Sequence, residues 1–244
     1  MAAGAREKGS PLNTPDVTNP DGWAIETQDV WRIYLLGARE VPALRGINLR
    51  VPKGHFLVLR GRSGSGKTTL LNCVGGLDQP TRGRIMVFGT DLATLDENHL
   101  TRWRSVEVGF VFQSFGLLPT LSAFENVELM QHIAGKSARE RRERARQCLD
   151  LVGLTKWQNH RPYEMSGGQQ QRVAIARALA NQPHLILADE PTGELDSTTA
   201  REILSIFRRI VDDEKVTLLV TSHDPLLDDY ADDVIHLKDG QIAE

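Results

Sequence analysis

One glycine-rich run carries the clearest chemical signal in the sequence, because it fits the pattern GxxxxGK[ST]: Gly61, Arg62, Ser63, Gly64, Ser65, Gly66, Lys67 and Thr68. Glycines let successive backbone N–H groups converge on phosphate oxygens, and a helix N-terminus adds a positive partial charge. In such a loop the lysine reaches the β- and γ-phosphates and the next hydroxyl coordinates Mg²⁺. The run therefore predicts a nucleoside triphosphate site, the alternative being a glycine-rich turn with an incidental lysine.

A pair of acidic residues follows the apolar run Leu185–Ala188. In open α/β sheets, ligands bind where such strands end, at the carboxyl edge. We expect Asp189 to hold the hydrated Mg²⁺ of the nucleotide, and Glu190 to orient and deprotonate the attacking water. The alternative is a solvated acidic pair that caps the next helix.

A second candidate anion site lies at Ser166, Gly167, Gly168 and Gln169, at the start of a predicted helix. A hydroxyl and free N–H groups at the positive end of a helix can bind an anion. Taken alone, the same residues fit a helix N-cap with a flexible approach equally well. Its meaning depends on the rest of the chain.

These residues need a scaffold, and the hydrophobic pattern from Trp23 onward predicts one. Short apolar strands alternate with longer helical segments, which indicates an α/β fold with a parallel sheet. The expected strands are 44–51, 55–60, 84–88, 185–188 and 217–220, and the expected helical segments include 69–74 and 197–211.

Two parts of the chain depart from this alternation. Residues 1–22 are rich in Gly, Pro, Asn and Thr, which predicts a disordered N-terminal tail before a domain at 23–244. Residues 114–164 lose their strand signals, which predicts an inserted helical subdomain. Its arginine-rich helix at 137–147 forms a solvated face or, alternatively, meets anionic lipid headgroups.

The composition excludes several classes of protein. The 244 residues are 40% hydrophobic and 25% charged, which is typical of a soluble globular domain and not of disordered, collagen-like or coiled-coil chains. A net charge of −3 gives no support for nucleic acid as a partner. No apolar run is long enough to span a membrane. The two cysteines, Cys73 and Cys148, are expected to be buried thiols.

Together these motifs make the sequence resemble the ATP-binding cassette (ABC) ATPase family over Ile25 to Ile242. The resemblance implies a P-loop NTPase core with an N-terminal antiparallel β subdomain and the inserted α-helical subdomain. It also implies ATP and Mg²⁺ as cofactors. Met165, which directly precedes the second candidate anion site, stands where the family usually has leucine. This substitution conserves side-chain volume.

The resemblance implies roles for single residues. Tyr34 would stack on adenine, and the nucleotide would be held by residues 61–68 with Thr69 and by Ser166–Gln169 of a second cassette. Thr68, Gln113 and Asp189 would contact the metal. Besides Glu190, the catalytic residues would be Gln113, near the water, and His223, which touches the γ-phosphate. Asp196 would lie at the dimer interface.

The sequence has one copy of each motif and no repeat, so the resemblance implies a head-to-tail homodimer with ATP between the two chains. It also implies a membrane permease that docks near 114–119, and a place at the cytoplasmic face of the inner membrane. Within the family, the runs 76–83, 109–113 and 125–128 resemble the subgroup that serves lipoprotein release, macrolide or antimicrobial-peptide export, and cell-division signalling. The alternatives are a soluble ABC protein of translation or DNA repair and a small-molecule P-loop kinase.

Overall fold

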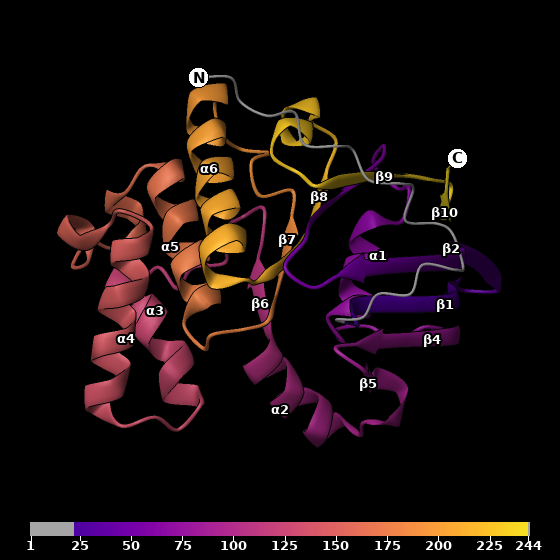
Figure 1. Ribbon diagram of the computed structural model, residues 1–244, viewed down its shortest axis with the longest axis horizontal. Coiled ribbons are helices and arrows are strands. Elements are labelled where there is room, and N and C mark those ends of the chain that lie inside the picture. Colours follow the sequence, from indigo (N-terminus) through magenta and orange to yellow (C-terminus); the bar gives the residue numbers. More distant parts are fainter. Residues whose placement is uncertain (1–21, 244) are drawn as a thin grey trace.

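The computed structural model describes residues 22–243, so the expected tail lies outside the described residues except for Gly22. A six-stranded sheet runs through the centre in the order β10-β9-β3-β8-β7-β6 (Figure 1). Its strands are parallel except for β10. Their bounds are Phe56–Arg60 (β3), Val108–Val111 (β6), Leu185–Asp189 (β7), Thr217–Ser222 (β8), Asp233–Lys238 (β9) and Gln241–Ile242 (β10).

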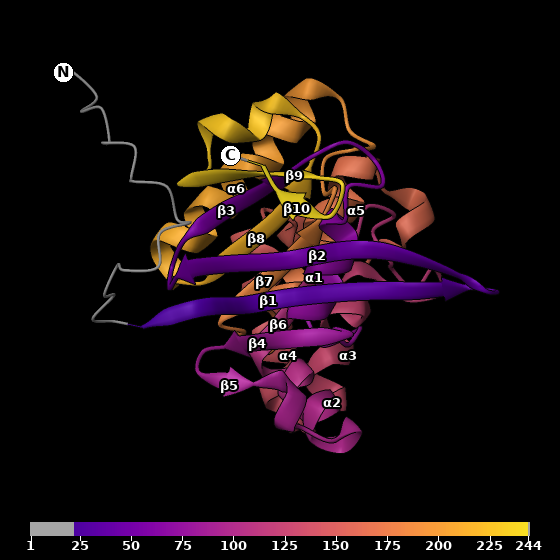
Figure 2. The same ribbon diagram turned by 90° about the vertical axis from the view of Figure 1, so that its right-hand side faces the viewer.

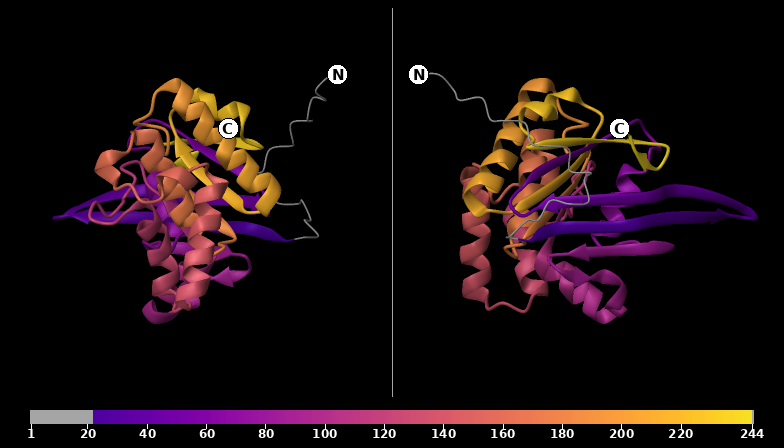
Figure 3. Two further views of the ribbon diagram at one scale, coloured as in Figure 1. Left: turned by 90° about the vertical axis from the view of Figure 1, so that its left-hand side faces the viewer. Right: turned by 45° about the vertical axis from the view of Figure 1, so that its right-hand side comes forward.

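A second, antiparallel sheet has the order β2-β1-β4-β5 and faces the viewer in Figure 2. Its bounds are Trp23–Leu36 (β1), Arg39–Pro52 (β2), Arg82–Val87 (β4) and Thr90–Asp91 (β5). Strands β1 and β2 form a long hairpin that projects beyond the rest of the molecule (Figures 2 and 3). Gly37 opens its two-residue turn with φ 62°, the glycine-first arrangement that tight hairpins favour.

Three helices accompany the central sheet: α1 (Lys67–Val74), α5 (Gly167–Leu179) and α6 (Ser197–Glu214). The longest, α6, buries one face at helical spacing, and its seven buried residues are Ala200, Ile203, Leu204, Ile206, Phe207, Ile210 and Val211. Asp196 caps its start by accepting hydrogen bonds from the backbone N–H groups of Thr198 and Thr199.

The chain between β6 and α5 holds two helices, α3 (Ala123–Ile133) and α4 (Ala138–Leu151), and the short 3-10 turns η2 (Thr155–Trp157) and η3 (Pro162–Glu164). Both helices begin with a capping box, formed by Ser122 with Glu125 and by Ser137 with Glu140. These helices pack against each other and against α5, beside the central sheet (Figure 1). No helix among residues 22–243 is long and apolar enough to cross a membrane.

The central sheet is buried on both faces. Along β3, Phe56 and Val58 enter an apolar cluster with α5 and α6, whereas Leu57 and Leu59 enter a second cluster with α1 and the antiparallel sheet. This alternation explains why the strand reads as a continuous apolar run in the sequence.

The predicted class, an α/β P-loop core with an antiparallel N-terminal sheet, is confirmed. Some boundaries differ, since β2 begins five residues earlier than expected. The sequence pattern did not predict α2 (Glu97–Glu107). The only buried residue of this helix is Leu100, so its sequence has no apolar periodicity. The strands β1, β6, β9 and β10 were also missed.

Candidate functional site

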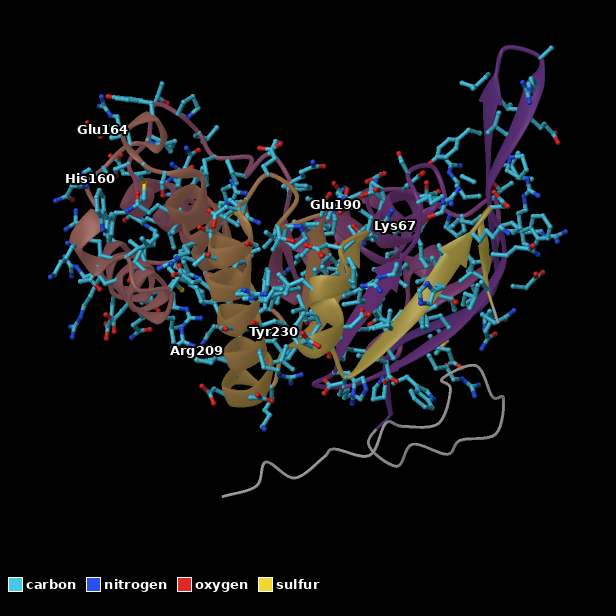
Figure 4. The ribbon with its side chains drawn as sticks, turned by 90° about the horizontal axis from the view of Figure 1, so that it is seen from above. Lys67, His160, Glu164, Glu190, Arg209 and Tyr230 are labelled. Atoms are coloured by element: carbon cyan, nitrogen blue, oxygen red, sulfur yellow. The ribbon has the colours of Figure 1, made fainter. Side chains whose placement is uncertain are left out.

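The site lies where the parallel strands β3, β7 and β8 end together. Arg60 is paired in register with Ser222, and Asp189 with Thr221, so the segments that follow these strands leave the sheet at one edge. Figure 4 shows Lys67 and Glu190 beside each other at this edge. The sequence prediction that the carboxyl ends of these strands bring the motifs together therefore holds in the geometry.

The glycine-rich loop wraps around the lysine at the start of α1. Lys67 is buried, and its Nζ donates to the carbonyl oxygens of Gly61 (2.8 Å) and Arg62 (3.3 Å). Gly66 has φ 103°, and a Cβ there would lie 2.6 Å from the carbonyl oxygen of Ala43. Only glycine fits this position. The close approach of the loop to Ala43 therefore depends on this glycine.

Next to the lysine, hydroxyl and carboxylate oxygens converge. Thr68 Oγ1 donates to both carboxylate oxygens of Asp189, at 3.0 and 3.1 Å. Thr221, at the end of β8, donates to the same carboxylate at 2.5 Å. Within residues 22–243 there is no cluster of three or more His, Cys, Asp or Glu side chains able to hold a metal. This oxygen set fits Mg²⁺, which needs one or two protein ligands when nucleotide phosphates and water complete its shell.

Glu190 lies between two basic side chains. Its Oε1 is 3.5 Å from Lys67 Nζ, and its Oε2 is 2.9 Å from His223 Nδ1. Its backbone has φ 45°, unusual for a non-glycine residue, and its N–H donates to the carbonyl and the hydroxyl of Thr221. Because β8 fixes the backbone, the carboxylate is aimed across the cleft at Lys67. The His223 side chain is 71% exposed, so it is accessible from outside the chain.

These side chains line a cleft of about 750 Å³. Its walls include most of the predicted nucleotide residues and all the predicted catalytic and metal residues: Arg62, Ser63, Gly64, Ser65, Gly66, Lys67, Thr68, Thr69, Gln113, Asp189, Glu190 and His223. Ala43 lines the cleft too, although nothing in its type could have signalled this. Thr221 was also missed, because a threonine at the end of a buried strand carries no sequence signal of its own.

Tyr34 is not among the residues that line this cleft. Its hydroxyl donates to Asp78 (2.6 Å), and the guanidinium of Arg32 lies 4.4 Å from its ring centroid. Burial and the neighbouring Asp78 carboxylate raise the pKa of this phenol. The structure places the ring on β1 beside α1, and its stacking on adenine stays a prediction.

The second candidate anion site is separate from the cleft. Ser166 caps α5 in a reciprocal pair with Gln169, in which each side chain accepts from the other residue's backbone N–H. A Cβ on Gly168 would lie 2.4 Å from the Thr199 side chain. The Thr199 hydroxyl in turn donates to Asp196, and this hydrogen bond lowers the pKa of that carboxyl. Thr199 therefore connects the start of α5 at Ser166–Gln169 with Asp196 at the start of α6.

The comparisons agree with this geometry. The protein family described as "ABC transporter" matches residues 44–193. An uncharacterized ABC transporter ATP-binding protein of Thermotoga maritima is 49% identical over 89% of this chain and 93% of that protein. The macrolide export ATP-binding/permease protein MacB of Syntrophobacter fumaroxidans is 47% identical over 89% of this chain but 31% of its own length, so this chain spans about a third of that relative.

A solved structure is also similar. The dimeric post-hydrolysis state of the ATP-binding cassette MJ0796, bound to ADP and Pi, superimposes with a TM-score of 0.83 at 42% identity. The match covers 90% of this chain and 97% of that one. With the family match over more than half of the chain, we conclude that this chain belongs to the ABC transporter family, as one of its ATP-binding ATPase domains.

Proposed function

We propose that the chain is the ATP-hydrolysing subunit of a membrane ABC complex, in which ATP closes a head-to-tail homodimer and hydrolysis reopens it. The observation that carries the catalytic part is the position of Glu190 between Lys67 (3.5 Å) and His223 (2.9 Å). An ATP γ-phosphate attracted by Lys67 enters the cleft next to this carboxylate. Glu190 is then free to accept a proton from an attacking water.

Each residue of the cleft has a defined task in this proposal. Lys67 and the N–H groups of residues 61–69 bind the phosphates, and Thr68, Gln113 and Asp189 hold Mg²⁺. Bound Mg²⁺ neutralises the charge that develops on the phosphates. His223 holds Glu190 when the cleft is empty and contacts the γ-phosphate when it is filled. Tyr34 stacks on the adenine.

The dimer is supported by what the cleft lacks within one chain. Ser166–Gln169 presents a helix N-terminus suited to an anion, yet among the described residues none of these four lines the cleft. A two-fold axis that brings the partner's α5 to this cleft completes both sites at once. The MJ0796 cassette, 42% identical, is a dimer with bound ADP and Pi.

A membrane partner is supported by a groove beside α3 and β6, of about 430 Å³. Three apolar side chains on its walls are 39–50% exposed: Leu77, Phe112 and Leu118. A permease segment that docks here would place the chain at the cytoplasmic face of the inner membrane. Recovery of the chain with a multi-span protein from detergent-solubilised membranes is expected, and recovery with ribosomes or DNA instead would favour the soluble alternative.

The catalytic proposal is tested with Glu190→Gln. Loss of the general base should lower phosphate release by roughly 10²–10⁴-fold. ATP binding, measured by isothermal titration, should persist because Lys67 and the loop are intact. The variant should also accumulate as an ATP-bound dimer in light scattering.

The matched control is Glu143→Gln, which removes an exposed carboxylate from α4, far along the chain from the cleft. It should keep wild-type turnover. Near-normal turnover of Glu190→Gln would show that this carboxylate is not the base.

A further inference from the structure

The tip of the β1–β2 hairpin exposes two large apolar side chains. Leu35 is 72% exposed and Leu36 is 68% exposed, although they follow directly on Tyr34 in β1. They pair across the strands with Glu40 and Arg39 on opposite faces of the hairpin, so each face of the tip has one exposed leucine beside one charged residue. Burying these two leucines against another surface would be favourable, because it removes their apolar area from water. We call Leu35 and Leu36 the hairpin patch.

A second exposed patch lies just before the start of α5. Tyr163 in η3 is 70% exposed, and Trp157 in η2 is 37% exposed. The Tyr163 hydroxyl accepts a hydrogen bond from Arg161, and Glu164 follows it, so this patch also has a base and an acid beside it. We call Trp157 and Tyr163 the aromatic patch.

Both patches lie on one side of the molecule, at opposite ends. In Figure 4 the violet hairpin projects at one end and the segment with His160 and Glu164 at the other, with Lys67 and Glu190 between them. The left view of Figure 3 likewise has the hairpin and the salmon segment before α5 projecting toward the same side. Since Lys67 and Glu190 lie between the two ends in this view, we take this side as the face of the proposed dimer.

A head-to-tail arrangement brings these two ends together. The start of α5 lies at the aromatic-patch end, and the partner's α5 must reach the cleft at the centre. The two-fold rotation that does this exchanges the two ends of the face, so each hairpin is carried toward the other chain's aromatic patch. A tip-to-tip rotation would instead leave α5 of the partner away from Lys67.

We propose that the hairpin patch of one chain packs on the aromatic patch of a second copy, forming two apolar clamps outside the nucleotide sites. This inference rests on the head-to-tail dimer of the proposed function. Each clamp joins the tip of the β1–β2 hairpin to the segment that leads into Ser166. It adds apolar contact area to the polar contacts of the proposed interface, and it covers leucines that a single chain leaves in water.

The test uses cross-linking between two chains that carry Glu190→Gln, one with Leu36→Cys and the other with Tyr163→Cys. The native thiols Cys73 and Cys148 are buried, so they leave the new cysteines as the reactive pair. A short bis-maleimide is expected to join the mixed chains when ATP is added and not before. Leu36→Cys alone is expected to give no dimer band, and Ile133→Cys, at the exposed end of α3, is the matched control partner.

The outcomes separate the two proposals. If light scattering shows an ATP-dependent dimer but the Leu36–Tyr163 pair does not cross-link, the clamp is wrong and the proposed function stands. A cross-link of Leu36→Cys to itself would also overturn the clamp. If no dimer forms with ATP, both proposals fail.

A second measurement avoids cross-linking. Replacing both leucines by serine, or Tyr163 by serine, should weaken ATP-dependent dimerisation of the Glu190→Gln chain by about tenfold, whereas Tyr163→Phe should not. Combining the serine variants should add little, because both remove one contact. Unchanged dimerisation in the serine variants would overturn the clamp, and ATP affinity of the single chain serves to confirm an intact cleft.

Discussion

The cleft at Lys67 and the helix start at Ser166 both suit an anion, yet they are built differently. The cleft joins residues from five separate segments, and its polar side chains pair with one another: Lys67 and His223 both contact Glu190, and Thr68 donates to Asp189. The helix start is built locally, since Ser166 and Gln169 satisfy each other within one turn. Among the described residues, none of the four from Ser166 to Gln169 lines the chain's own cleft.

In the dimer that we propose, this difference divides the work between two chains. A cleft made by the fold of one chain can bind ATP before any partner arrives. In the proposed dimer, the locally capped helix start contributes only when another chain presents its nucleotide. Variants in the two regions should therefore fail at different steps.

The largest effect is expected from a pair of variants, one in each region. Lys67→Ala should lower ATP affinity of the single chain by more than about 100-fold, because it removes the buried cation between Gly61, Arg62 and Glu190. Ser166→Arg should leave that affinity near wild type but reduce phosphate release by about 100-fold, because a bulky cation then blocks the partner's phosphates. Isothermal titration and phosphate-release assays measure the two quantities.

Mixing the two inactive chains is the decisive control. Half of the dimers formed would be mixed, and each would hold one site with an intact lysine and an intact serine, so activity should return to roughly a quarter of wild type. Each variant should retain its helical circular dichroism. No recovery on mixing, with both variants folded and able to dimerise, would contradict the division between chains.

Residue type and spacing predicted the parts of this site that depend on local order. Gly61–Thr68 and Asp189-Glu190 each follow an apolar run, and the parallel class of the sheet places both at one edge. The sequence could not reveal Thr221, because a threonine at the end of a buried strand looks like an ordinary strand residue. It became visible only once β8 was known to neighbour β7, where it donates to Asp189.

The same limit explains the misses in the fold. Helix α2 buries one residue, Leu100, so its stability comes from its N-cap at Asp96 and from neighbours that the sequence does not identify. The hairpin's length was also missed, because its tip is apolar and exposed. Hydrophobic periodicity in a sequence reveals elements that bury one face, and the two leucines at this tip are exposed in the single chain.

A smaller effect is expected when ATP changes how fast the two cysteines react. One thiol lies near the cleft and the other lies in the helical segment that leads to Ser166. Cys73 lies on α1, behind the cleft, and Cys148 on α4, in the helical segment before α5. Burial raises the pKa of the Cys73 thiol to about 12 and of the Cys148 thiol to about 11. At pH 8 each thiol therefore reacts only when its surroundings open.

ATP should slow the labelling of Cys73 more than that of Cys148. The single-cysteine variants Cys148→Ser and Cys73→Ser report each site, and labelling with a chromogenic disulfide at pH 8 measures the opening rates. With ATP at about ten times its dissociation constant, protection of Cys73 should rise roughly tenfold, because ATP binds the N-terminal turn of the same helix. Lys67→Ala should abolish this gain.

The thiols also predict a direction for pH. Their pKa values in the folded chain lie above the unfolded value near 9, so the folded state keeps protons that the unfolded state releases. Stability from this source is complete below about pH 9 and falls as the pH rises toward 11 to 12. Replacing both cysteines by alanine should flatten that alkaline slope in urea unfolding.

If ATP instead protected both thiols equally, the cleft and the helical segment would open as one unit, and the two regions would differ only in their chemistry.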